Sequence, residues 1–340
     1  MKKSHRTRGK QLFRYFLAAI VLFYVVSQGQ WEESLKTLAN VSFYTLVLLF
    51  VFVVGGLLFR FLRWYAIIRL ETPIQFRTAA EIDLIINFVN QLLPSRLSGS
   101  AAAPLVISQR TGISMGTSIG ITGISTALYA VIYAIVGGIG IILLIADSSS
   151  SILGIIGLST LLYLIAGLTI LISGFKITTI DTLLKRLAPV IQQIPVVGII
   201  AVAVSERIPD FAEESITVFQ NILYSPLIIC LYVVGWIGSV ALFPALRVAT
   251  LFSAFGTPFT PLITLPAILI AAYSVTLLPL TPGGIGVTEA TAAAVFVSLG
   301  IPYEIAAATV LVDRVLGVYL PALLGWYPMI RENPLTLKTK

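Results

Sequence analysis

The chain has 340 residues, of which 57% are hydrophobic and 11% are charged. Apolar runs of about 20 residues, the length that crosses the core of a bilayer, recur along it, so we predict a polytopic all-helical integral membrane protein. Its one cysteine and one histidine exclude an intramolecular disulfide and a His/Cys metal cluster, and its net charge of +7 is explained by basic residues on one side of a membrane without a nucleic-acid partner.

The N-terminal part of the chain predicts two spanning helices. Residues 11–27 follow a basic tail but lack the small-residue cleavage site of a signal peptide, so we expect a retained helix. A short, slightly acidic loop follows and is predicted to be external. Residues 41–59 then lead into a basic segment, from Arg60 to Arg77, that contains Trp64 and is typical of a cytoplasmic interface.

A re-entrant hairpin, entered from the cytoplasmic side, is predicted next, because residues 78–93 and 101–109 are each too short to span a bilayer. Its tip carries Arg96 among serines, an arrangement that suits bidentate capture of a phosphate, although an arginine that snorkels to the headgroups would look the same. Three amides share one helical face before this tip: Asn87, Asn90 and Gln91. These amides either line a polar path or hydrogen-bond between helices.

The middle of the chain predicts three more crossings and one polar segment. Residues 115–146 are expected to cross outward and residues 152–174 to return. Residues 176–222 are the most polar stretch and are predicted to form amphipathic helices at the cytoplasmic interface. Residues 225–249 then cross outward again.

A second re-entrant hairpin, entered from outside, is predicted over residues 262–280 and 287–299, which flank a break in a very apolar region. The break contains several residues that interrupt helices and one carboxylate: Pro279, Pro282, Gly283, Gly284, Gly286 and Glu289. Unwound backbone at membrane depth is tolerated only where protein or a water-filled cavity surrounds it. The break therefore indicates a cavity, with the start of the Glu289 helix suited to a phosphate or carboxylate; the alternative is a kink packed against its neighbours.

The last spanning helix, over residues 304–328, places two ionisable residues inside the membrane. Asp313 lies about ten residues into it, near the middle of the bilayer at 1.5 Å per residue, and Arg314 follows. Buried ionisable residues usually pair, so we expect a network of Glu289, Asp313 and Arg314, with Arg96 as a possible member. Such a network either contacts substrate or is a structural ion pair.

Two patterns support this topology. All but four of the 22 Lys and Arg residues fall in the predicted cytoplasmic segments, and both termini are predicted to be cytoplasmic. The four exceptions are Lys36, Arg96, Arg247 and Arg314. The single domain, residues 1–340, also divides into two weakly similar halves, 11–146 and 152–328, of opposite orientation. Broken segments in inverted halves are typical of a transporter site near the midplane.

The sequence contains none of the residue sets of common enzymes. It has no Ser/His/Asp triad, because its one histidine is in the N-terminal tail, and no phosphate-binding loop that ends in Gly-Lys-Ser or Gly-Lys-Thr. We therefore expect no enzymatic activity and no cofactor.

The break and the last helix together resemble the transmembrane region of the lysylphosphatidylglycerol synthase and flippase family. That family's Pro-Gly-Gly-x-Gly-x-x-Glu signature matches the motif from Pro282 to Glu289, and its later membrane arginine matches Arg314. Arg96 and Gly99 resemble the family's first hairpin. Two departures occur in the first half, where the family usually has a Glu and a Glu-Arg pair: Ser100 and Ser125-Thr126.

The elements taken in chain order predict six transmembrane helices and two re-entrant helical hairpins arranged as an inverted repeat. The resemblance implies that this protein is a flippase-like translocase, which we expect in the plasma membrane. Such a protein would move a polar or charged lipid, such as an aminoacylated phospholipid or a lipid-linked sugar, between leaflets. Membrane lipids are the expected partners, and a lipid-modifying transferase is a further candidate. A scaffold that presents lipid to such a transferase, or a small-solute transporter, remains the alternative.

Overall fold

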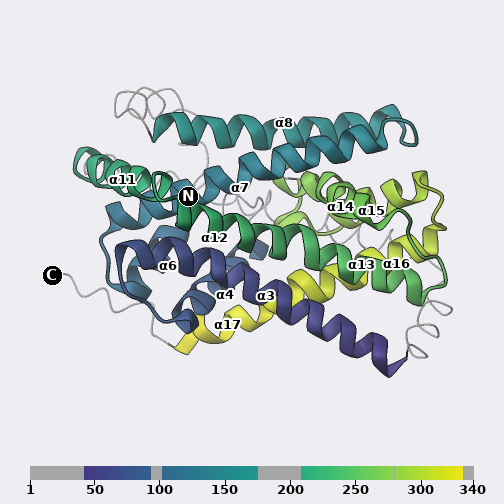
Figure 1. The fold of residues 1–340 in the computed structure, drawn as a ribbon, viewed down its shortest axis with the longest axis horizontal. Helices are drawn as coiled ribbons and strands as arrows, with labels where there is room; N and C mark the ends of the chain where they lie inside the picture. The colour runs from purple at the N-terminus through teal and green to yellow at the C-terminus, as the bar shows by residue number, and fades with distance from the viewer. Residues whose placement is uncertain (1–41, 93–101, 175–207, 279, 332–340) are drawn as a thin grey trace, which may run out of the picture.

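The computed structural model describes residues 42–92, 102–174, 208–278 and 280–331, and the regular structure of these residues is entirely helical (Figure 1). Among them, five helices are long and apolar enough to cross a membrane: Phe43–Glu71, Met115–Leu144, Ser150–Ser173, Pro226–Ala254 and Tyr303–Met329. The prediction of an all-helical, multi-pass membrane protein is therefore confirmed. The expected first spanning helix, residues 11–27, lies outside the described residues.

The spanning helices differ in regularity. Three are continuous, namely α3 (Phe43–Glu71), α7 (Met115–Leu144) and α8 (Ser150–Ser173). The other two each contain a π-helical turn. In the first, the turn η1 (Ile237–Leu242) joins α12 (Pro226–Trp236) to α13 (Phe243–Ala254). In the second, the turn η5 (Val315–Tyr319) joins α16 (Tyr303–Arg314) to α17 (Leu320–Arg331).

The remaining helices are shorter. The α-helices among them are α4 (Phe76–Leu92), α6 (Ala103–Thr111), α11 (Ile208–Leu223), α14 (Leu265–Tyr273) and α15 (Val287–Ser298). Three are single 3₁₀ turns: η2 (Leu262–Thr264), η3 (Ser274–Leu277) and η4 (Pro282–Gly284). The expected arms of the two hairpins are thus short helices, α4 and α6 in the first and α14 and α15 in the second.

Most helix boundaries lie close to the predicted ones, but α3 is longer. Three serines accept a backbone N–H at the helix starts, Ser42 for α3, Ser114 for α7 and Ser149 for α8. Helix α3 continues to Glu71, whereas the sequence predicted an end at residue 59. Three of the basic residues that suggested this end, Arg60, Arg63 and Arg69, lie within the helix, and Arg60 and Arg63 line a cavity.

Helix α7 is the centre of the packing. It contacts α8, α11, α14, α6 and α3, and Figure 1 shows α8 beside it along the long axis of the molecule. Small residues permit the close approach: a Cβ added to Gly140 would lie 2.1 Å from the carbonyl oxygen of Ala267 in α14, and one added to Gly120 would lie 2.5 Å from that of Ser215 in α11. Glycine contacts of this kind let membrane helices pack backbone to backbone.

A proline follows each π-helical turn, at Pro244 after η1 and at Pro321 after η5. Proline has no N–H to donate to the carbonyl four residues earlier, and its ring crowds that carbonyl, so the helix must widen or kink. In η1 the widened turn is closed by the Phe243 N–H, which donates to the Gly238 carbonyl. Both turns border the cavity described below.

Helix α11 is the described part of the polar segment that was predicted over residues 176–222. Its apolar side packs on α7, with Ile216, Val218 and Phe219 buried. Glu214 accepts hydrogen bonds from the hydroxyls of Ser114 and Thr117 at the start of α7. Helix α11 is thus docked on the helix bundle, while the relation of the segment to a membrane interface stays a prediction.

The Glu214 contact predicts a pH dependence of stability. The hydrogen bonds from Ser114 and Thr117 lower the pKa of Glu214 below its usual value of 4.5. A lowered pKa in the folded state means that this contribution to stability is present above pH 4.5 and is lost as the pH falls through the folded-state pKa. We expect Glu214→Gln to melt at a lower temperature than the wild type at pH 7, with the gap closing in acid. A gap that does not depend on pH would contradict this.

Candidate functional site

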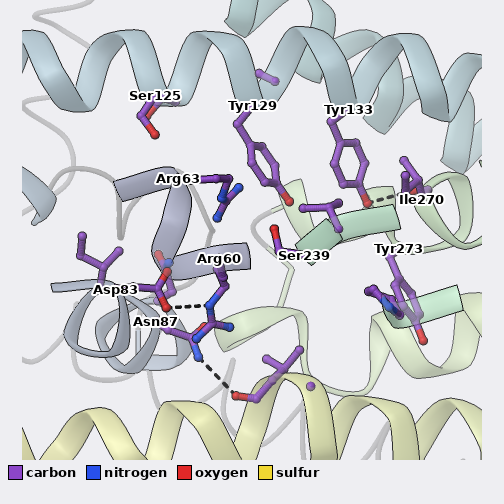
Figure 2. A pocket seen from close by; sticks show the side chains of 18 of the residues that line it. Arg60, Arg63, Asp83, Asn87, Ser125, Tyr129, Tyr133, Ser239, Ile270 and Tyr273 are labelled. Carbon is purple, nitrogen blue, oxygen red and sulfur yellow. Dashed lines mark hydrogen bonds and ion pairs between the residues drawn. The ribbon is translucent and has the colours of Figure 1, made fainter. Parts of the chain in front are cut away.

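A cavity of about 220 Å³ lies among α3, α4, α6, α7, α8, α14 and the two spans that contain π turns. Its polar lining comes from segments far apart in the sequence: Arg60, Arg63, Asp83, Asn87, Asn90, Ser125, Thr126, Tyr129, Tyr133, Tyr163, Ser239, Arg247, Tyr273, Asp313 and Arg314. Figure 2 shows Tyr129 and Tyr133 descending from α7 and the two arginines of α3 approaching from another side. The cavity is therefore polar although the spans around it are apolar.

The carboxylate of the glycine-rich motif is fully engaged inside the protein. Glu289, in α15, is 1% exposed and its Oε1 accepts from the Nε of Arg314 at 2.9 Å and from the hydroxyl of Tyr319. Its Oε2 accepts from the backbone N–H of Gly286 at 2.6 Å. Glu289 thus caps its own helix and ties α15 to the last spanning helix.

The expected network of Glu289, Asp313 and Arg314 exists, but it contains a fourth charge. Asp313 pairs with Arg247 of α13, whose Nε and Nη2 both lie 2.8 Å from its Oδ1. The hydroxyl of Tyr273 donates to the other oxygen of Asp313 at 3.0 Å, and Arg314 lies over the Tyr273 ring, 5.9 Å from its centroid. One connected group of charges therefore joins α13, α14, α15 and α16.

A second ion pair lies on the other side of the cavity. The Nε of Arg60 in α3 donates to Asp83 in α4 at 2.6 Å, as Figure 2 shows. Arg60 Nη2 is buried and has no hydrogen-bond partner within the described part of the chain. A buried guanidinium nitrogen without a hydrogen-bond partner is costly, so this group is suited to a ligand acceptor.

Arg63 differs from the other cavity arginines because no carboxylate in the described ranges pairs with it. It lies against two aromatic rings, 5.4 Å from the centroid of Tyr129 and 5.9 Å from that of Tyr232, and its buried Nε has no hydrogen-bond partner there. Aromatic rings stabilise a guanidinium by cation–π attraction without neutralising its charge. The cavity thus contains one cation that no described carboxylate neutralises.

Tyrosines form a continuous wall of the same cavity. Tyr133 stacks on Tyr163 with ring centroids 4.4 Å apart and on Tyr129 at 5.6 Å, and its hydroxyl donates to the Ile270 carbonyl at 2.8 Å. Trp236 packs edge-on against Tyr133. This wall is held in place by stacking and by a hydrogen bond to α14, so it presents a rigid amphipathic surface.

Only some of the residues that the sequence singled out line the cavity. Asn87, Asn90, Asp313 and Arg314 do, and Asn87 donates to the Val318 carbonyl of η5 at 3.4 Å. Gln91 does not, but it meets the glycine motif, because a Cβ on Gly283 would lie 2.4 Å from Gln91 Oε1. The predicted tips themselves, Arg96, Gly99, Ser100 and Pro279, lie outside the described residues.

The glycines of the motif are explained by backbone shape. Gly283, Gly284 and Gly286 have φ angles of 60°, 73° and 83°, in the left-handed region that side chains rarely adopt. They turn the chain between η3 and α15 and bring η4 against α4. The helix start that was expected to bind an anionic ligand is filled by Glu289, which satisfies the Gly286 N–H itself.

Sequence reasoning missed several cavity residues, and a signal existed for some of them. Arg247 lies in an apolar span, where an ionisable residue usually faces the protein interior and pairs. Asp83 interrupts an apolar arm in the same way. Arg60 and Arg63 carried no such signal, because a basic residue at the end of an apolar run is also what a cytoplasmic interface contains.

The polar groups of the lining are of the kind that bind anionic oxygens. No group of three or more His, Cys, Asp or Glu residues that could hold a metal occurs within the described ranges. The cavity instead offers guanidinium and amide donors beside an aromatic wall, which suits a polar ligand with anionic oxygens.

Comparison with known proteins places nearly the whole chain in one family. Residues 11–325 match the model described as the lysylphosphatidylglycerol synthase TM region. A UPF0104 membrane protein of Methanothermobacter thermautotrophicus is 24% identical over 320 residues, which cover 92% of this chain and 91% of that protein. A UPF0104 membrane protein of Pyrococcus horikoshii is 29% identical over 69 residues, or 20% of this chain and 21% of its own length. No solved structure matches.

Proposed function

Because the chain belongs to the family of lysylphosphatidylglycerol synthase transmembrane regions, we propose that it is a lipid translocase, which moves a polar or charged lipid between leaflets of the plasma membrane. The observation that carries this proposal is the cavity, which holds four arginines among apolar spans. Ionisable residues at membrane depth are expensive and mark substrate pathways by default. A headgroup in this cavity would exchange its hydration for the polar lining.

The size of the cavity supports a headgroup as its occupant. Its volume of about 220 Å³ is below the roughly 300–1,000 Å³ of pockets that enclose a drug-sized ligand. Two acyl chains cannot fit beside a headgroup in this space. We therefore propose that the chains stay in the bilayer while the headgroup passes through the cavity.

The proposed topology has six spanning helices and two re-entrant hairpins in inverted halves, with both termini cytoplasmic. Two left-handed glycines at equivalent places support the repeat: Gly112, with a φ angle of 76°, precedes α7, and Gly300, with a φ angle of 86°, precedes α16. The π turns also support exchange, because such turns are frequent at functional sites and Ser239 and Gly317 within them line the cavity. Lipids are the proposed partners, and no enzymatic step is proposed.

Leaflet exchange by the purified protein tests the proposal. In proteoliposomes with chain-labelled fluorescent phosphatidylglycerol, dithionite should bleach the inner-leaflet label faster than in protein-free vesicles. Thr126→Phe, which fills the cavity from α7, should slow bleaching toward the protein-free rate. Ile139→Phe, on the same helix but 50% exposed on the outer surface, should not.

Two results would contradict this function. Bleaching at the protein-free rate by the wild type, for this lipid and for a panel of other headgroups, would exclude translocation. Lipid binding without exchange would then favour the scaffold that presents lipid to a transferase. Solute uptake that needs no lipid exchange would favour a small-solute transporter.

A further inference from the structure

The charges around the cavity do not cancel. Each carboxylate of the lining is already paired within the described structure, Asp83 with Arg60 and Asp313 with Arg247. Arg314 also lines the cavity and is paired with Glu289, which is not part of the lining. Counted together with Glu289, which pairs with Arg314 but does not line the cavity, these side chains leave one positive charge in excess, that of Arg63.

Two buried guanidinium nitrogens at the cavity are donors without a partner among the described residues. Arg60 Nη2 and Arg63 Nε are buried without a hydrogen-bond partner among the described residues, and both belong to residues of the lining. Two guanidinium groups that both lie at one cavity are suited to the oxygens of a phosphate, whose charge would neutralise the excess and whose lone pairs would accept these bonds. The Asn90 Oδ1, also buried without a partner, suits a hydroxyl donor.

An aminoacylated headgroup does not fit this pattern. A lysyl group carries two ammonium charges, which need acceptors of negative charge, and each carboxylate of the described lining is already held by an arginine. Burying further cations beside Arg63 would add repulsion between like charges in a medium that screens them weakly. A headgroup with a phosphate, hydroxyls and no ammonium would neutralise the positive charge of the cavity and would pair with both its guanidinium donors and the Asn90 Oδ1 acceptor.

We infer that the cavity selects lipids with a net anionic, hydroxylated phosphate headgroup, such as phosphatidylglycerol, over zwitterionic and aminoacylated lipids, and that Arg63 is the residue that determines this selectivity. The inference rests on the proposed function for its lipid occupant. Tyr129 and Tyr232 hold Arg63 at the cavity by cation–π contact, so its charge stays available to the phosphate.

A binding competition tests this selectivity without requiring transport. Purified protein in detergent receives equal amounts of phosphatidylglycerol, phosphatidylcholine and lysylphosphatidylglycerol, and native mass spectrometry measures the occupancy of each. The wild type should prefer phosphatidylglycerol, and Arg63→Gln should weaken its binding by roughly tenfold or more, the usual loss for a hydrogen bond to a charged group. Arg63→Glu should shift the preference to lysylphosphatidylglycerol.

Arg69→Gln provides the matched control. Arg69 is on the same helix and also lies over a tyrosine ring, that of Tyr65 at 5.4 Å, but it is exposed and outside the cavity. Its replacement should leave all three occupancies unchanged. Melting temperatures of all variants separate loss of binding from loss of folding.

The outcomes distinguish this inference from the proposed function. Equal or stronger binding of lysylphosphatidylglycerol by the wild type, or equal effects of the Arg63 and Arg69 variants, would overturn the selectivity while leaving translocation intact. Selective binding without leaflet exchange would support the selectivity and exclude translocation. Inorganic phosphate that binds when phosphatidylglycerol does not would show a site for a free anion and overturn the lipid assignment.

Discussion

Replacing Arg314 with methionine is expected to lower the free energy of unfolding by about 3–5 kcal/mol, because it leaves Glu289 as an uncompensated buried charge. The two side chains are 2% and 1% exposed, so water cannot take the place of the lost partner. Arg314 also contacts the rings of Tyr273 and Tyr319, and these contacts would be lost as well. Unfolding in increasing fractions of a denaturing detergent measures the change.

A double-mutant cycle makes this prediction specific. Glu289→Gln alone is also expected to destabilise, because it leaves the Arg314 charge buried without a partner. The double variant Glu289→Gln/Arg314→Met should cost clearly less than the sum of the two single changes, since it removes both charges together. Costs that simply add would contradict coupling.

A control for the Arg314 and Glu289 variants lies on the same helix as Arg314. Glu304→Gln, in the first turn of the helix that carries Arg314, should change stability by no more than about 0.5 kcal/mol.

The contacts of Glu289 also indicate its role. Its carboxylate oxygens already accept hydrogen bonds from Arg314, Tyr319 and Gly286, so we expect the loss of Glu289 to reduce transport by destabilising the fold. The structural interpretation of this carboxylate is therefore the one that the geometry supports.

The second large effect is expected at the contact of α7 and α14. A Cβ on Gly140 would lie 2.1 Å from the carbonyl oxygen and 2.7 Å from the carbonyl carbon of Ala267. Backbone atoms cannot rotate away as a side chain does, so α14 itself must move. We expect Gly140→Ala to destabilise the protein by about 1–3 kcal/mol, the usual cost of overpacking.

Gly138 offers a control two residues away on the same helix. A Cβ there would meet nothing within 4 Å. Gly138→Ala should therefore stabilise the protein by up to about 1 kcal/mol, because alanine restricts the unfolded chain and favours helix. Melting temperatures in detergent should move in opposite directions for the two variants, and shifts of the same sign would contradict the packing argument.

The position of the helices could be predicted well from local sequence. The lengths of the apolar runs predicted the spans near 115–146 and 152–174 closely, and that near 225–249 with an end that falls short of Ala254, because helix length in a membrane follows from hydropathy and rise per residue. The predicted end of α3, at residue 59, was wrong, because Arg60 and Arg63 resemble an interfacial segment when only their order in the chain is known. Whether these two side chains face a membrane interface or the protein interior depends on which helices pack against α3.

The candidate site was predicted in part. The pairing of Glu289 with Arg314 was anticipated, because two ionisable residues in apolar segments must find partners. The pairing of Asp313 with Arg247, 66 residues apart, was not, because a sequence does not show which of several buried charges will be neighbours. The helix start at Gly286 looked open to a ligand, and only the structure shows that Glu289 fills it.

The sequence by itself thus determined the class of protein, the spans within the described residues and the glycine-rich break before Glu289. These features depend on composition, length and backbone permissiveness, which are local properties. Only the tertiary structure decided that Arg60, Arg63, Arg247 and Arg314 line one cavity and that Arg63 has no carboxylate partner among the described residues. That outcome depends on the rotation and packing of helices far apart in the chain, because a side chain faces whatever its helix is turned toward.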